Sequence, residues 1–322
     1  MGQETIITEG MEAAVVDNHD GMGGREQHDA RSQLSLPSER EEGGHWSKQL
    51  YCLVPRARRF NGYNGIAEWR VANSASPFLP SASGLNCEFI FDAGGMTFEP
   101  RWAKPEPDYL AQPSRVIRLA AEQAMIVIEP GSTRGIAIEM THRLRPPWYL
   151  DTDYRVTPTR DTVLSEWLGV FWASYMQTPY SPVYYFLGQN RDDTNPHWIS
   201  SACGAPGSVN YAPAQPDLHF AMPEDRDALL YGAASIGYAR PFFGGKIEDM
   251  LFAFLFRSPP GTQIRFGYNP SGAGPGCPAW DYAFLIDNPQ ANQTYAFRTR
   301  AVYKPFEDIN EMIDLDDAWS PS

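Results

Sequence analysis

From about residue 66 to residue 305 the chain alternates apolar and polar residues in short runs, which is typical of half-buried β-strands. In the run RGIAIEMTHRL, the side chains of Ile136, Ile138, Met140 and His142 fall on one face. Gly and Pro residues separate these runs, as they do in sandwiches and barrels. We expect strands at 66–72, 86–92, 115–120, 123–130, 134–144, 149–158, 165–176, 183–189, 233–239, 246–257, 262–270, 279–287 and 293–305.

This pattern predicts an all-β fold, a large antiparallel β-sandwich with few short helices. One stretch is ambiguous, because Trp167, Val170, Phe171 and Ser174 also share helical spacing and allow a short helix over 164–174. Residues 1–45 are polar and acidic with little packing material, so we expect a disordered tail. Residues 46–306 form the single sandwich domain, and 307–322 form an acidic C-terminal tail with room for one helical turn.

The formal net charge of −13 and the pI near 4.9 disfavour nucleic-acid binding and attraction to an anionic membrane. No window approaches the ~18 apolar residues of a membrane-spanning helix. The first residues, MGQETIITEGMEAAVV, lack a secretory signal, so a cytoplasmic location is the default expectation. The four cysteines form no C-x-x-C pair, which favours free thiols.

Candidate acid–base groups are His142, His197, Glu166 and Asp281, because histidine and carboxylate pairs transfer protons near neutral pH. His142 has an alternative interpretation as a buried histidine bonded to a neighbouring strand. His197 lies beside Trp198 in a predicted loop, and Asp281 lies between two aromatic residues. His219 is expected to be structural or exposed. The histidine spacing fits no metal motif, and no Gly-rich phosphate loop is present, so we expect neither metal nor cofactor.

Aromatic side chains could stack on sugar rings, although in a β-sandwich they also build the core. An arginine could bind an acidic sugar. The candidate ligand contacts are Arg101, Trp172, Tyr175, Gln177, Trp198 and Trp280.

Three segments resemble the galactose mutarotase-like β-supersandwich proteins: AMIVIEPGSTRGIAIEMTHRLRPPWYLDTDYRVTP, FWASYMQTP and PAWDYAFLIDNPQANQTYAFRTRAVYKP. The resemblance covers about residues 125–305, a bit over half of the chain. It implies a large antiparallel sandwich whose concave face carries a histidine as general acid and a glutamate as general base. His142 or His197 would match the acid, and Glu166 or Glu248 would match the base.

Three functions remain open at this stage. The first is a cofactor-free epimerase, lyase or hydrolase that acts on a sugar or glycoside by His/carboxylate catalysis. The second is a non-catalytic carbohydrate-binding or assembly module, and the third is a cyclase or isomerase of a hydrophobic metabolite. A histidine and a carboxylate in one cleft would favour catalysis, whereas aromatic and neutral amide groups alone would favour binding. Long strands with edges to cover make a homodimer an expectation.

Overall fold

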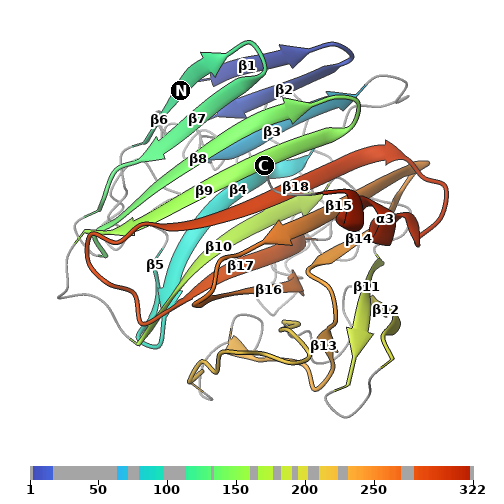
Figure 1. The fold of residues 1–322 in the computed structure, drawn as a ribbon. Coiled ribbons are helices and arrows are strands. Elements are labelled where there is room, and N and C mark those ends of the chain that lie inside the picture. The colour runs from blue at the N-terminus through green and yellow to red at the C-terminus, as the bar shows by residue number, and fades with distance from the viewer. Residues whose placement is uncertain are drawn as a thin grey trace, which may run out of the picture.

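The structure is a computed structural model. It describes residues 3–16, 64–71, 80–97, 114–131, 134–159, 166–176, 183–190, 195–201, 210–223, 231–269 and 279–319. Two large antiparallel sheets face each other, as Figure 1 shows, which confirms the predicted all-β sandwich.

The first sheet has the strand order β1-β2-β3-β4-β10-β17-β16, with the short β5 paired to β4. Its strands in the described residues are β1 (Gln3–Thr8), β2 (Met11–Val16), β3 (Gly65–Val71), β4 (Pro80–Asp92), β5 (Gly95–Thr97), β10 (Trp167–Met176), β16 (Thr262–Asn269) and β17 (Ala279–Asp287).

The second sheet has the order β12-β11-β14-β15-β18-β9-β8-β7-β6, with β13 paired to β11. Its strands in the described residues are β6 (Ser114–Ala120), β7 (Gln123–Ile128), β8 (Ile136–Arg145), β9 (Tyr149–Pro158), β11 (Tyr184–Gln189), β12 (His197–Ser201), β13 (Gly237–Tyr238), β14 (Phe242–Ile247), β15 (Met250–Arg257) and β18 (Tyr295–Pro305).

Aromatic side chains from both sheets fill the space between them. Trp172 of β10 stacks on Tyr282 of β17, with ring centroids 5.9 Å apart, and the Tyr282 hydroxyl lies 2.8 Å from the Tyr154 hydroxyl of β9. This hydrogen bond therefore links the two sheets. The aromatic members of this interior cluster are Trp69, Tyr154, Trp172, Tyr184, Phe186, Tyr238, Phe243, Phe252, Phe254, Phe256, Phe266, Trp280, Tyr282, Phe284, Phe297 and Tyr303.

The central strands β15 and β17 are buried on both faces. All residues of β15 except Arg257, and all residues of β17 except Asp287, are buried. Because neighbouring side chains of a strand point to opposite faces, each sheet must be covered on its outer side as well. The cover of the second sheet is the helix α3 (Glu311–Ala318), which lies across it in Figure 1.

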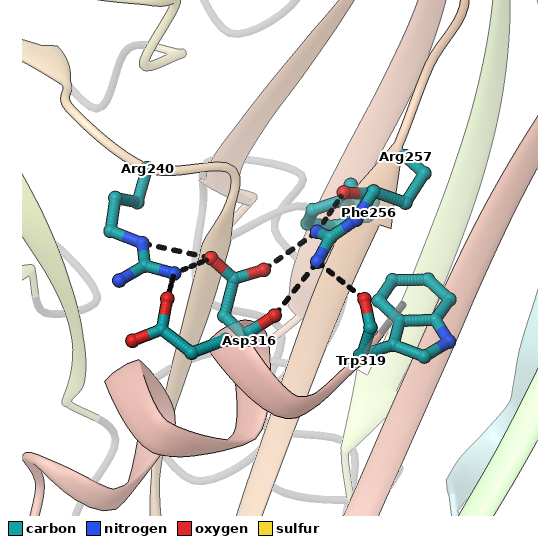
Figure 2. A network of polar contacts seen from close by, with 6 residues as sticks. Arg240, Phe256, Arg257, Asp316 and Trp319 are labelled. Carbon is teal, nitrogen blue, oxygen red and sulfur yellow. Dashed lines mark hydrogen bonds and ion pairs between the residues drawn. The ribbon is translucent and has the colours of Figure 1, made fainter. Parts of the chain in front are cut away.

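Helix α3 is fixed by the carboxylate of Asp316, which is 5% exposed. Arg257 Nη1 donates to Asp316 Oδ1 (2.6 Å), and Arg240 Nε donates to Asp316 Oδ2 (2.8 Å), as Figure 2 shows. Arg257 also donates through Nη2 to the backbone carbonyls of Asp316 (2.8 Å) and Trp319 (2.9 Å). Two guanidinium groups, one from the end of β15 and one from the bend between β13 and β14, therefore bind the C-terminal end of the helix, where the backbone carbonyls favour a positive charge.

Several predictions of local structure were wrong. Residues 3–16 lie within the predicted disordered tail, yet they form β1 and β2. The Ile7 N–H donates to the Ala121 carbonyl (2.8 Å) and so joins β1 to the second sheet. Residues 167–176 form a strand, which confirms the strand predicted at 165–176 and excludes the alternative helix over 164–174. The run 246–257 contains a turn, because Glu248 adopts a positive φ of 52° between β14 and β15. The C-terminal segment holds a helix of eight residues.

The Asp316 network yields a stability prediction. Replacing Asp316 by Asn leaves two partly buried guanidinium groups without their anion, so we expect the free energy of unfolding to fall by roughly 2 kcal/mol. Urea unfolding would measure this loss. The matched control is Asp317→Asn, at the neighbouring helix position, since Asp317 is 64% exposed and pairs with Arg240. An equal loss in both variants would show that α3 is not held by the buried carboxylate.

Candidate ligand-binding cavity

The outer face of the first sheet is covered by residues 210–223 and 231–237, which we call the cover segment. Backbone hydrogen bonds join it to strand β16, from Tyr211 N–H to the Phe266 carbonyl (2.8 Å) and from Phe266 N–H to the Tyr211 carbonyl (3.2 Å). On its other side, Ala214 N–H donates to the Tyr238 carbonyl and Tyr238 N–H donates to the Ala212 carbonyl, both at 2.9 Å. The cover segment is therefore held by strands of both sheets.

Side chains also dock the cover segment on a second aromatic cluster on the outer face. Trp167 Nε1 donates to the Ala221 carbonyl (3.1 Å), and the Tyr231 hydroxyl donates to the Asp92 carbonyl (3.0 Å). The rings of Trp167 and Tyr231 lie 6.1 Å apart, and Phe220 packs against Trp167 at 6.3 Å. Gly237 permits close approach of the chains, because a Cβ there would lie 2.4 Å from the Ala214 Cα.

Between the cover segment and β16 lies a cavity of about 440 Å³, a volume within the usual range of small-molecule sites. Its polar side chains are His219, Ser235, Gln263 and Arg265, and its aromatic side chains are Phe220 and Tyr231. The remaining lining residues in the described chain are Ala212, Pro213, Ala214, Pro216, Leu218, Met222, Pro223, Gly232, Ala233, Ala234 and Gly237.

Because side chains alternate between the two faces of a strand, Gln263 and Arg265 of β16 both point toward this cavity. Ile264 and Phe266 belong to the interior cluster, so Gln263 and Arg265 point to the outer face. Gln263 Nε2 donates to the Leu218 carbonyl of the cover segment (3.4 Å), and Arg265 Nε donates to Gln263 Oε1 (3.0 Å). The guanidinium carbon of Arg265 lies 5.8 Å from the ring centroid of Phe220.

The guanidinium of Arg265 is a buried cation without an anionic partner among the described residues. The residue is 7% exposed, and its buried Nη1 has no hydrogen-bond acceptor. Burial lowers the pKa of Arg265 to about 10, which still leaves the side chain charged at neutral pH.

The predicted site residues His142, Trp172 and Trp280 lie in the interior between the sheets. His142 is fully buried, its Nδ1 lies 2.9 Å from Thr152 Oγ1, and its ring centroid lies 6.3 Å from that of Trp172. Burial lowers the pKa of His142 to about 3. Trp280 packs between the rings of Tyr184 and Phe252. These positions agree with the alternative interpretation of a buried histidine and a core of aromatic residues, and they do not support contact with a ligand from solvent.

The other predicted residues are spread over the two sheets. Glu166 is exposed directly before β10, and Asp281 is buried, with Oδ1 accepting a hydrogen bond from the Ser174 backbone N–H (2.7 Å). His197 is exposed and opens β12, a strand where a loop was predicted. Trp198 Nε1 donates to Asn310 Oδ1 (2.9 Å) beside α3. The structure therefore brings His142 and Trp172 together, but it does not place these histidines with Glu166 or Asp281 in one cleft.

Some predictions fall outside the described residues. Arg101 and Gln177 lie there, and for Tyr175 the structure describes the backbone alone. Cys87 is a free and buried thiol, and burial raises its pKa well above the ordinary value. Within the described part of the chain, no three His, Cys, Asp or Glu side chains are grouped as metal ligands would be. None of the described helices has the length and apolar character needed to cross a membrane.

Sequence reasoning missed Gln263 and Arg265 as ligand candidates. It expected His219 to be structural or exposed, and His219 is an exposed residue of the cavity lining. The sequence shows only that Arg265 is a charged residue between the apolar Ile264 and Phe266. What the sequence could not reveal is that the cover segment lies over it without supplying a carboxylate from the described residues.

Comparison with known proteins gives a weak likeness of fold. No protein-family profile matches the chain, and no curated protein matches its sequence. A crystal structure from Escherichia coli K12 described as an aldose 1-epimerase is 10% identical, with a TM-score of 0.41 over 94% of this chain and 99% of that one. The α-N-acetylgalactosaminidase of Bifidobacterium bifidum, solved with GalNAc, is also 10% identical, with a TM-score of 0.45 over 77% of this chain and 34% of that one.

A heparinase III structure gives a similar result, with 10% identity and a TM-score of 0.40 over 95% of this chain and 35% of that one. The mutarotase-like resemblance inferred from the sequence is thus accompanied by a weak structural likeness, which concerns the fold alone.

The burial of His142 yields a pH prediction. The folded protein keeps His142 neutral down to about pH 3, whereas the unfolded chain binds a proton near pH 6.5. Its contribution to stability is therefore complete above pH 6.5 and is lost as the pH falls toward 3, at up to about 1.4 kcal/mol per pH unit. Replacing His142 by Leu should flatten the dependence of unfolding free energy on pH between 4 and 6.

Urea unfolding at several pH values would measure that slope. The control is His197→Gln, because His197 is exposed on β12 and its removal should leave the slope as it is in the unmodified protein. An unchanged slope in His142→Leu would contradict a buried neutral imidazole.

Proposed function

We propose that this protein binds a sugar or glycoside in the cavity beneath the cover segment, and that it acts as a binding protein rather than as a His/carboxylate catalyst. The observation that carries the proposal is the composition of the cavity wall. It combines two aromatic rings, Phe220 and Tyr231, with polar groups from Gln263, Arg265 and His219. Aromatic faces pack against the apolar faces of sugar rings, while amide and guanidinium groups bond to their oxygens.

The same wall argues against the two other hypotheses. General acid–base catalysis of the predicted kind requires a histidine and a carboxylate within hydrogen-bond reach of one substrate. Among the described lining residues, His219 supplies the imidazole, but no Asp or Glu accompanies it. A hydrophobic metabolite would require an apolar pocket, whereas Gln263 and Arg265 place polar groups on the floor of this one.

The experiment is a thermal-unfolding screen with neutral and acidic mono- and oligosaccharides. A ligand that binds only the folded state stabilises it by about 2.7 kcal/mol at one hundred times its dissociation constant. We expect at least one sugar to raise the unfolding temperature. Ala233→Trp should abolish that shift, because Ala233 is an exposed lining residue and an indole there would fill the cavity.

The matched control is Ala296→Trp, which adds the same indole at an exposed position of β18, on the second sheet. It should retain the full shift. The proposal fails if no sugar stabilises the protein, or if Ala233→Trp and Ala296→Trp respond to the sugar equally.

A further inference from the structure

We infer that the cavity selects a ligand with an anionic group, a carboxylate or a sulfate ester on a sugar, and that the guanidinium of Arg265 binds that group. This inference deepens the proposed function and depends on it for the sugar part of the ligand. It rests on the geometry of one side chain.

Arg265 presents hydrogen-bond donors that the described protein does not use. A guanidinium has five N–H donors, and in Arg265 one of them, at Nε, donates to Gln263 Oε1 (3.0 Å). The buried Nη1 has no acceptor. The two terminal nitrogens form the fork that binds both oxygens of a carboxylate or two oxygens of a sulfate.

Among the described residues, none supplies an opposite charge to Arg265. Burying an isolated charge is strongly unfavourable unless an opposite charge or several hydrogen bonds accompany it. The other arginines around the covers have such partners in this structure: Arg240 and Arg257 pair with Asp316, and Arg134 pairs with Asp92. Arg265 instead lies beside the ring of Phe220 and near the Tyr238 phenol, whose hydroxyl donates to the Ile264 carbonyl (2.9 Å). An anionic ligand would supply the missing negative charge.

The surroundings of Arg265 hold its fork in place for a ligand. Gln263 fixes the Nε side of the guanidinium and is itself bonded to the Leu218 carbonyl (3.4 Å). The guanidinium carbon lies over the ring of Phe220, 5.8 Å from its centroid. A donor that is fixed before binding loses little conformational entropy when the ligand arrives.

The test compares three sugars that differ in one substituent: galactose, galacturonate and galactose 6-sulfate, together with the corresponding glucose series and inorganic sulfate. Calorimetry on the full chain would measure affinity. We expect an anionic sugar to bind at least about 10-fold more tightly than its neutral parent, as a hydrogen-bonded charge pair provides. The carboxylate and sulfate arms show which oxyanion the fork accepts.

Two variants connect that preference to Arg265. Arg265→Met keeps much of the side-chain volume and removes the charge, so the preference for the anionic sugar should disappear. The unliganded variant should be at least as stable to urea as the unmodified protein, because it loses an uncompensated buried charge. A purely structural arginine would instead lose stability on replacement. The control Arg257→Met should lose stability, since it breaks the pair with Asp316, and should keep the anion preference.

The outcomes separate this inference from the proposed function. Equal binding of neutral and anionic sugars, unchanged in Arg265→Met, overturns the inference and leaves the sugar site standing. Stabilisation by inorganic sulfate that requires Arg265, without binding of any sugar, supports the anion site and overturns the sugar function. Absence of binding by every probe overturns both.

Discussion

The constraint on which the structure depends is that its central strands are apolar on both faces. Strands β15 and β17 bury side chains in the interior cluster and, at the alternating positions, against the outer covers. A two-layer sandwich would leave half of these residues in water, at about 25 cal/mol for each Å² of exposed apolar surface. The sequence therefore requires additional layers. On the second sheet the layer is a helix, and on the first sheet it is an irregular segment that contains Pro and Gly.

The two covers differ in whether they supply a carboxylate to the arginines beneath them, and this difference indicates where the site lies. Helix α3 brings Asp316 to the outer face of the second sheet, where it meets both Arg240 and Arg257. The cover segment brings Phe220, His219 and the Leu218 carbonyl to the first sheet, where Arg265 meets an aromatic ring and an amide. Arg240 and Arg257 are thus neutralised by the protein itself. Arg265 instead faces a cavity, which is the arrangement expected where a ligand supplies the compensating charge.

The sequence predicted those features that depend on neighbouring residues. The strict alternation of Ile136, Ile138, Met140 and His142 placed one face of β8 in the interior, and all four residues are buried. Prediction from the sequence failed where the local composition suggested disorder but contacts with distant strands bury the residues. Strands β1 and β2 have acidic, polar surroundings in the chain, yet Ile6 and Val15 are fully buried because β3 and the second sheet lie next to them. At 165–176 the predicted strand is confirmed, because β10 pairs with β4 and β17 on its two sides, and the helix that the spacing of Trp167 and Phe171 also allowed does not form.

The candidate site was less predictable because its chemistry arises from contacts between distant parts of the chain. The aromatic-rich runs made Trp172 and Trp280 candidates for ligand contact, but both belong to the interior cluster of 16 aromatic side chains. The cavity is lined by Phe220 and Tyr231 instead. Arg265 differs from the other arginines because no described residue supplies an anion to its guanidinium, and the absence of such a partner has no sequence signature.

The overall charge gives this site a second property. A chain of net charge −13 repels anions over the distance of a Debye length, about 10 Å at 0.1 M salt. Attraction to an anionic ligand must therefore come from within the cavity, where a buried guanidinium is screened much less than a surface charge. Added salt would weaken the long-range repulsion more than the short-range pair. The acidic net charge therefore opposes the binding of anions in general, and Arg265 binds an anion only when the rest of the ligand fits the wall of the cavity. This arrangement favours selectivity over strength of attraction.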